Sequence, residues 1–273
     1  MSTIKSFKDK YGPTALVAGA SEGMGAAYAH ALAAHGLDLV LIARRTAQLE
    51  ATAHQIAQQH GVKVLSVACD LATADATQQI AQTIGDREIG FMVYNAAQSY
   101  IGPYLATGLS THLGIAAVNT MTPLAMLHEF GGKMVQRKRG GIVLMASIAG
   151  FQGSGYLTTY AATKAFNRVL AEGLWYEWKP LGVDVIACCA GATATPNYLN
   201  TSPGKASWLE PKPQSPEQVV EECLARIGTT PSFVSGTGNK LVSFLMQRLL
   251  PRKTAIRLMG DGMKKMYKIP PSP

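Results

Sequence analysis

This 273-residue chain has few charged residues, few cysteines and no long apolar run, and each scarcity excludes a class of protein. No apolar run reaches the roughly 18 residues of a membrane-spanning helix, and the N-terminus lacks the apolar stretch of a secretory signal. The four cysteines, Cys69, Cys188, Cys189 and Cys223, show neither CxxC spacing nor the spread of a disulfide framework. With 47% hydrophobic and 15% charged residues, the composition indicates a globular protein. We expect it to be cytoplasmic.

Metal ligands and a nucleic-acid-binding surface are not indicated either. The six histidines form no HExxH motif or clustered pair, so we expect no metal site. The net charge of +8 is concentrated at the C-terminal end. From Lys240 onward the sequence has eight lysines and arginines but only one acidic residue, Asp261. The first 239 residues therefore carry a net charge of about +1, and a body so close to neutral argues against binding nucleic acid.

Short apolar runs rich in β-branched residues alternate with longer helical patterns along the chain. We predict strands at Thr14–Gly19, Asp38–Ala43, Lys63–Ala68, Ile89–Tyr94, Gly141–Ala146, Val183–Cys189 and Ser232–Ser235. We predict helices at Gly23–His35, Thr46–His60, Thr73–Ile84, Leu109–Gln136 and Tyr160–Trp178. This alternation predicts an α/β fold, with a single doubly wound, seven-stranded parallel sheet over residues 1–239. The segment Thr201–Pro216 reads as a long loop with a short helix, of a length typical of lids over a site.

A glycine-rich turn joins the first predicted strand to the first long helix. Its sequence, Gly19-Ala20-Ser21-Glu22-Gly23-Met24-Gly25, follows a GxxxGxG spacing. Glycines there let the backbone approach a pyrophosphate at the N-terminus of a helix, although a tight turn without a ligand is the alternative. The next strand ends in Arg44-Arg45, whose guanidinium groups suit a ribose 2′-phosphate. We therefore predict NADP(H) over NAD(H). The alternative is that the two arginines are simply solvated residues at the start of the next helix.

A second motif combines a phenol, an amine and a hydroxyl. Tyr160 and Lys164 are four residues apart on a predicted helix, so both side chains can enter one pocket. A nearby ammonium favours phenolate, so we expect Lys164 to lower the pKa of Tyr160. Ser147 ends a predicted strand at the carboxyl edge of the sheet, where such folds bind ligands, and its hydroxyl can bind a substrate carbonyl.

With these motifs, the sequence resembles the short-chain dehydrogenase/reductase family, which has a Rossmann fold, from Thr14 to about Ser235. The resemblance implies a catalytic set of Asn119, Ser147, Tyr160 and Lys164, with Asn119 holding a water of a proton relay. It implies a cofactor site formed by Gly19, Ser21, Gly23, Met24, Gly25, Arg44, Arg45, Asp70, Leu71, Asn95, Ala96, Ala97, Tyr160, Lys164, Gly191, Thr193 and Thr195. Ala18, Ala97 and Ala190 depart from the residues more common in the family.

The family resemblance implies hydride transfer between NADP(H) and a carbonyl or alcohol. Tyr160 would donate the proton, Ser147 polarise the carbonyl oxygen, and Lys164 hold the nicotinamide ribose. A non-catalytic NADP-binding sensor or scaffold is the alternative, and within the family so is an enzyme that acts on sugars or performs dehydration. The family often forms dimers or tetramers through the long helices, here Leu109–Gln136 and Tyr160–Trp178, so we expect a homodimer or homotetramer.

Aromatic side chains near both predicted edges of the site favour a hydrophobic or aromatic ketone over a sugar or an acid. One wall would hold Phe151, Gln152 and Tyr156, after Ser147. The other would hold Tyr198, Leu199 and Trp208, in the predicted loop.

The chain continues past the last predicted strand as a basic extension, residues 240–273, similar to that of ketoacyl and hydroxysteroid reductases. In Lys240–Leu250, Leu241, Val242, Leu245, Met246 and Leu249 share one helical face. We predict that this face packs on the body of the protein. Covering the cleft, contacting a partner subunit, or binding an anionic membrane or an acyl carrier are the alternatives.

Overall fold

A seven-stranded, all-parallel sheet forms the centre of the molecule in a computed structural model that describes residues 6–201 and 212–270. The strand order is β3-β2-β1-β4-β5-β6-β7. The strands are β1 (Thr14–Ala18), β2 (Asp38–Ala43), β3 (Val64–Ala68), β4 (Ile89–Tyr94), β5 (Gly140–Ser147), β6 (Val183–Ala190) and β7 (Ser232–Val234). Chain order reverses between β1 and β4, which is where doubly wound sheets bind their ligands.

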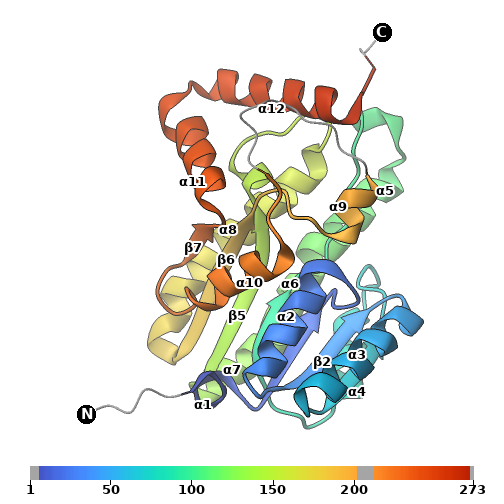
Figure 1. The fold of residues 1–273 in the computed structure, drawn as a ribbon, viewed down its shortest axis with the longest axis vertical. Helices are drawn as coiled ribbons and strands as arrows, with labels where there is room; N and C mark the ends of the chain where they lie inside the picture. Colours follow the sequence, from blue (N-terminus) through green and yellow to red (C-terminus); the bar gives the residue numbers. More distant parts are fainter. Residues whose placement is uncertain (1–5, 202–211, 271–273) are drawn as a thin grey trace.

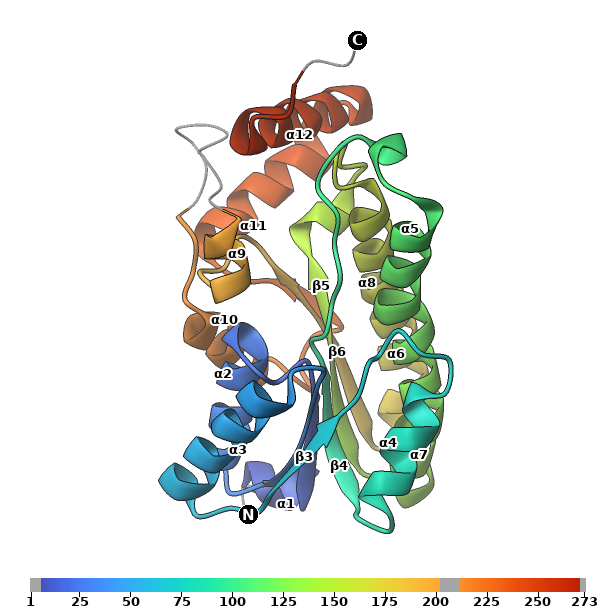
Figure 2. The same ribbon diagram turned by 90° about the vertical axis from the view of Figure 1, so that its right-hand side faces the viewer.

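Helices cover both faces of this sheet (Figures 1 and 2). One face carries α2 (Gly23–Ala34), α3 (Thr46–His60) and α10 (Pro216–Leu224). The other carries α4 (Ala76–Ile84), α5 (Leu109–Ala116), α6 (Thr122–Met126), α7 (Gly132–Arg137) and α8 (Thr158–Trp178). Short helices α1 (Phe7–Tyr11) and α9 (Pro196–Asn200), and one-turn 3₁₀ segments at Tyr104–Ala106, Ile148–Phe151 and Lys179–Leu181, complete the body.

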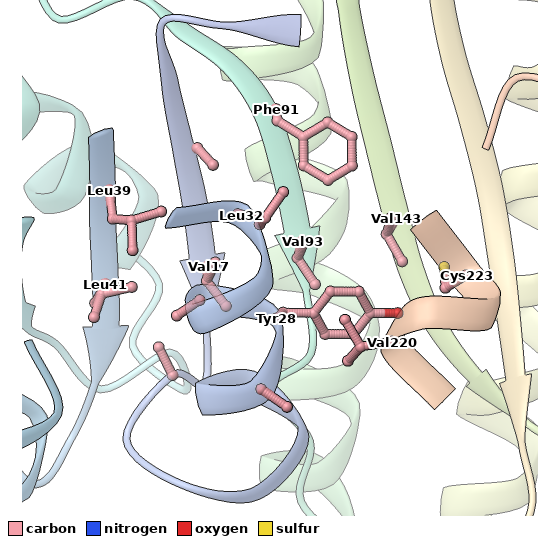
Figure 3. Packing of buried hydrophobic residues seen from close by; sticks show 14 of the residues in the cluster. Val17, Tyr28, Leu32, Leu39, Leu41, Phe91, Val93, Val143, Val220 and Cys223 are labelled. Atoms are coloured by element: carbon pink, nitrogen blue, oxygen red, sulfur yellow. The ribbon is translucent and has the colours of Figure 1, made fainter. Parts of the chain in front are cut away.

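Each face of the sheet has its own hydrophobic core. Figure 3 shows the first core, where Tyr28 and Leu32 of α2 pack between the sheet and Val220 of α10. The second core joins the opposite face to α4, α6 and α8. Strands β1, β4 and β6 are buried along their whole length, as expected for a parallel sheet covered on both sides. All four cysteines are buried and unpaired.

The predicted strands are all present, but the predicted helix at Leu109–Gln136 is interrupted. Its α-helical pieces α5, α6 and α7 are joined by π-helical turns at Ala117–Met121 and Leu127–Gly131. Pro123 lies just after the first of these turns and has no N–H to donate to the carbonyl of Asn119. The regular α-helical ladder therefore cannot continue through this point.

The C-terminal extension forms two helices rather than one. They are α11 (Thr237–Phe244), continued by a π turn at Leu245–Leu249, and α12 (Arg252–Tyr267). Pro251 separates them, and α12 crosses the end of the molecule toward which β5 leads (Figures 1 and 2). Within the described residues, no helix is long and apolar enough to cross a membrane.

Candidate active site

The glycine-rich turn is packed so closely that side chains cannot be added to it. At Gly19, where φ is +80°, a Cβ atom would lie 2.7 Å from the Cα of Ala96. A Cβ on Gly25 would overlap the carbonyl oxygen of Gly19. The Asn95 side chain donates to that same carbonyl at 3.0 Å. The N-terminus of α2 is thereby left open to a ligand, a cradle that fits the pyrophosphate of a dinucleotide.

The arginine pair lies beside this turn, but its two members differ. Arg45 forms an ion pair of 2.7 Å with Glu22 and approaches the Ser21 hydroxyl at 3.4 Å. Burial alone would raise the pKa of Glu22, but hydrogen bonds from Arg45 and Gln48 outweigh it and lower that pKa. Arg44 is exposed and, within residues 6–201 and 212–270, forms no ion pair. Of the two guanidinium groups, that of Arg44 is therefore the one not engaged by Glu22.

The remaining predicted cofactor residues follow strand ends along the same edge of the sheet. Asp70 and Leu71 follow β3, and the exposed Asp70 side chain accepts from the Ala72 N–H at 3.0 Å. Ala96 and Ala97 follow β4. Gly191 and Thr193 follow β6. Thr195 caps α9 and lies close to the glycine-rich turn, since a Cβ on Gly23 would be 3.0 Å from the methyl group of Thr195. Met24 packs against the first core.

Ser147 and Tyr160 meet at the carboxyl end of β5. Ser147 is the last residue of β5 and pairs in register with Ala190 at the end of β6. Tyr160 lies in the first turn of α8. Burial raises the pKa of Tyr160 to about 12, a hydrogen bond with the Ser147 hydroxyl opposes that shift, and Tyr267 adds to it through its charge. The phenol therefore holds its proton throughout the neutral range.

Lys164 lies one turn further along α8 and is 2% exposed. Its Nζ donates to the carbonyl of Met145 at 2.7 Å and lies 5.5 Å from the centroid of the Tyr160 ring. Burial lowers the pKa of Lys164 to about 8. The pKa of Tyr160 is raised rather than lowered as expected, because burial of the phenol is the largest effect and outweighs the hydrogen bond with Ser147.

Asn119 is fully buried in the first π turn and joins the sheet to α8. Its Oδ1 accepts from the Gln98 N–H at 2.8 Å, and its Nδ2 donates to the Gln98 carbonyl and to the Thr163 hydroxyl, both at 2.9 Å. Thr163 precedes Lys164 on α8. The side chain of Asn119 therefore positions the loop after β4 against the helix that carries the phenol and the amine.

The predicted substrate walls are only partly assembled. Tyr156 lies near α12, with the Lys264 Nζ 5.4 Å from its ring centroid. Phe151 instead packs against the second core, and the Arg168 guanidinium carbon lies 5.0 Å from its ring centroid. Phe151 is therefore held on the body rather than free to form a wall. Tyr198 lies on α9, whereas Trp208 falls outside the described residues.

Helix α12 brings further residues to the site that the sequence pattern did not indicate. A methyl group added to Gly155 would lie 3.6 Å from the Cα of Gly260, and the Arg252 guanidinium donates to the Phe151 carbonyl at 2.8 Å. Tyr267, at the end of α12, lies close enough to Tyr160 to raise its pKa. The segment after Ser147 is thus covered by a helix more than 90 residues away in sequence.

Comparison with known proteins identifies the family to which the chain belongs. Residues 13–205 match the family model described as short chain dehydrogenase. A 7beta-hydroxysteroid dehydrogenase of Clostridium sardiniense is 30% identical over 239 residues, which cover 86% of this chain and 90% of that protein. The inactive hydroxysteroid dehydrogenase-like protein 1 of Homo sapiens is 28% identical over 250 residues, covering 89% of this chain and 73% of that protein.

Solved structures also match along most of the chain. One, from work on 7beta-hydroxysteroid dehydrogenase stereoselectivity, has a TM-score of 0.88 at 28% identity and covers 93% of this chain and 99% of its own. A short-chain dehydrogenase from Sphingobium yanoikuyae in complex with NADPH has a TM-score of 0.73 at 28% identity, covering 82% of this chain and 87% of its own.

Proposed function

Because the chain belongs to the short-chain dehydrogenase family, and is thus an oxidoreductase acting on CH–OH and C=O groups, we propose that it is an NADPH-dependent ketoreductase. The proposal is that it interconverts a ketone and a secondary alcohol on a hydrophobic or aromatic substrate. The observation that carries it is the meeting of Ser147 and Tyr160 at the end of β5, one helical turn from the buried Lys164.

The chain's own residues suit each part of such a cofactor. The glycine cradle would hold the pyrophosphate, Arg44 the 2′-phosphate and Asp70 the adenine side of the site. Gly191, Thr193 and Thr195 would hold the nicotinamide end, near the register pair of Ser147 and Ala190. When bound, the nicotinamide supplies or accepts the hydride. The NADPH complex of the Sphingobium relative supports the choice of NADP(H).

The reductive reaction then follows from the protonation states of the site. Ser147 donates a hydrogen bond to the substrate carbonyl and polarises it. As negative charge develops on the carbonyl oxygen, Tyr160 transfers its proton to that oxygen. Lys164 supplies a positive charge beside the phenol and holds the ribose. Because Pro123 has no N–H, the carbonyl of Asn119 is available to a water that returns a proton to Tyr160.

The hydrophobic substrate is supported by the site's surroundings and by its relatives. Tyr156, Tyr198 and Tyr267 lie on the segments that surround the site. The Clostridium relative and the first solved structure are 7beta-hydroxysteroid dehydrogenases by name, which makes a bulky polycyclic ketone or alcohol the first class to test.

Replacing the phenol tests the proposed function. We expect Tyr160→Phe to lower kcat/KM for ketone reduction by about 10²–10⁴-fold, because the general acid is lost while the ring and fold remain. Steady-state NADPH oxidation against a panel of bulky ketones measures this effect. Tyr176→Phe is the matched control, since Tyr176 lies on the same helix but is 78% exposed. A Tyr160→Phe enzyme that kept the parent rate would refute the assignment.

A non-catalytic NADP-binding protein is the second candidate, and one relative favours it. The human relative is described as inactive. The present chain retains the serine, tyrosine and lysine of the site, which supports turnover. Tight NADPH binding without oxidation across the ketone panel would establish the non-catalytic role instead.

We also propose that the chain forms a homo-oligomer in the cytoplasm. Leu109 and Leu113 of α5 are 69% and 59% exposed, and Val169 and Tyr176 of α8 are 57% and 78% exposed. These apolar side chains give α5 and α8 an outer surface suited to a second copy. Light scattering on the purified protein measures the oligomeric state. The four buried, unpaired cysteines suit a reducing compartment.

A further inference from the structure

The helix α11 is turned so that its polar side faces the protein and its apolar side faces solvent. Asn239 and Ser243 are 5% and 6% exposed, whereas Leu241 and Phe244 are 59% and 56% exposed. The π turn that follows continues this outer face with Leu245 and Leu249, which are 39% and 64% exposed. For Leu241, Leu245 and Leu249 the predicted packing on the body is therefore wrong, whereas Val242 and Met246 of the same predicted face are half-buried. We call the four outer residues, Leu241, Phe244, Leu245 and Leu249, the apolar stripe.

The polar contacts of Asn239 explain the reversed orientation. Its Nδ2 donates to the Ser235 carbonyl at 2.9 Å and to the Gln214 Oε1 at 3.2 Å. The Asn239 side chain also packs tightly on Gly191, because a Cβ on Gly191 would lie only 2.4 Å from the same nitrogen. A leucine of α11 therefore has no room on this inner side. The contacts of Asn239 therefore fix the orientation of α11 and keep the apolar stripe exposed to solvent.

Exposed cations follow the apolar stripe along the chain. Arg248 lies within the π turn, and α12 carries exposed lysines and arginines along its outer side. We call this outer side the basic face, formed by Lys253, Arg257 and Lys265 of α12 and by Lys268, which follows the helix. Within the described part of the chain, none of these cations forms an ion pair, and Asp261 is the single acidic residue of α12.

We propose that the apolar stripe and the basic face together bind the surface of an anionic lipid membrane. Large apolar side chains beside several lysines and arginines are the composition that inserts into the headgroup region, where acidic lipids supply the complementary charge. The proposal goes beyond the proposed reaction and does not depend on it.

A second copy of the chain fits this surface less well. Symmetric pairing places the same patch on both partners, and here it would bring two sets of unpaired cations together. The exposed apolar residues of α5 and α8 belong to helices that cover one face of the sheet, whereas α12 crosses the end of the molecule (Figure 2). Self-association therefore has its own surface and leaves the apolar stripe free.

Vesicle flotation with the full chain tests the proposal. We expect binding to phosphatidylcholine vesicles that contain phosphatidylglycerol, little binding to pure phosphatidylcholine, and weaker binding as salt is raised. Leu245→Glu with Leu249→Glu should abolish binding. Arg257→Gln with Lys265→Gln should weaken it roughly tenfold or more. Each variant is checked for an unchanged melting temperature and for unchanged NADPH oxidation without vesicles.

Matched controls remove similar groups elsewhere. Leu181→Glu introduces acid at a leucine that is 40% exposed, and Lys8→Gln with Lys63→Gln removes two cations from the opposite end of the molecule. These variants should bind as the parent does. Absence of binding to the anionic vesicles at low salt would overturn the proposal. The proposal would also be overturned if the stripe variants still bound vesicles but no longer self-associated, or if they lost only the binding of an acidic acyl carrier.

Discussion

Two titratable side chains of the site are shifted in opposite directions by the same cause. Burial disfavours the charged form of each, so it raises the pKa of Tyr160 to about 12 and lowers that of Lys164 to about 8. Near pH 7 both groups therefore hold their protons. This state suits a phenol that donates a proton beside a positive charge.

The pH dependence of ketone reduction follows from these two values. Above about pH 8, Lys164 loses its proton and with it the positive charge that assists proton transfer, while Tyr160 stays protonated. We therefore expect kcat for reduction to fall as the pH rises through about 8. Lys164→Met should show a low residual rate without this transition. A parent rate that stays constant up to pH 10 would contradict the assignment.

The proposed preference for NADP(H) depends on a single side chain near the turn. Arg45 is engaged by Glu22, so Arg44 is the residue expected to bind a 2′-phosphate. We expect Arg44→Ala to raise the KM for NADPH about tenfold or more, and to leave the KM for NADH unchanged. Arg87→Ala is the control, because Arg87 follows α4 and donates to the Ile84 carbonyl. Equal effects on both nucleotides would argue against NADP(H) preference.

At the scale of elements, the glycine-rich turn and helix α2 form one rigid unit. The carbonyl of Gly19 accepts from Asn95 and lies where any side chain on Gly25 would have to go. The start of α2 is thus fixed against the loop after β4. A helix N-terminus held in this way presents its free N–H groups in a constant direction.

Adding a methyl group at two helical glycines should distinguish the effect of the close approach at Gly25 from the general effect of alanine on helix stability. We expect Gly25→Ala to weaken NADPH binding about tenfold or more, because the turn must move away from α2. Isothermal titration with NADPH measures the loss. Gly132→Ala is the control, since a Cβ there meets nothing within 4 Å and it should leave binding unchanged. If both variants bound NADPH as the parent does, the cradle would not be the cofactor site.

At the scale of the whole molecule, a buried carboxylate ties the N-terminal helix to the sheet. Asp184 of β6 is 6% exposed, accepts from the Tyr11 hydroxyl at 2.7 Å, and pairs with Lys10 at 2.7 Å and Lys179 at 2.6 Å. Burial would raise the pKa of Asp184, but its three partners lower it below the usual range. The folded state therefore favours the ionised form.

This lowered pKa makes a prediction about stability. The stabilisation is present above the pKa of an unfolded aspartate, about 3.9, and is lost as the pH falls through the lower folded-state value. We expect Asp184→Ala to reduce the free energy of unfolding by about 2 kcal/mol at pH 7 and by less near pH 3. Urea denaturation measures both values. Asp86→Ala, at an exposed position, should leave the midpoint unchanged, and an equal loss at both pH values would contradict the linkage.

Much of the catalytic edge could be predicted from sequence because parallel strands bring their carboxyl ends together. The strand ends at Ala18, Tyr94, Ser147 and Ala190 meet at one edge of the sheet, and the residues after them form the candidate site. Local patterns sufficed there, because strand periodicity, a glycine turn and a four-residue helical spacing are properties of neighbouring residues.

Other features were decided only by tertiary packing. Helical periodicity groups Leu241, Leu245 and Leu249 on one face but is silent about which face meets the body, and the contacts of Asn239 turned that face outward. The pairing of Glu22 with Arg45 and the position of α12 over Gly155 likewise depend on contacts between distant segments. The sequence by itself thus determined the sheet, its strand-end residues and the family. Only the folded chain decided which side chains are free, because burial and pairing depend on neighbours that are distant in sequence.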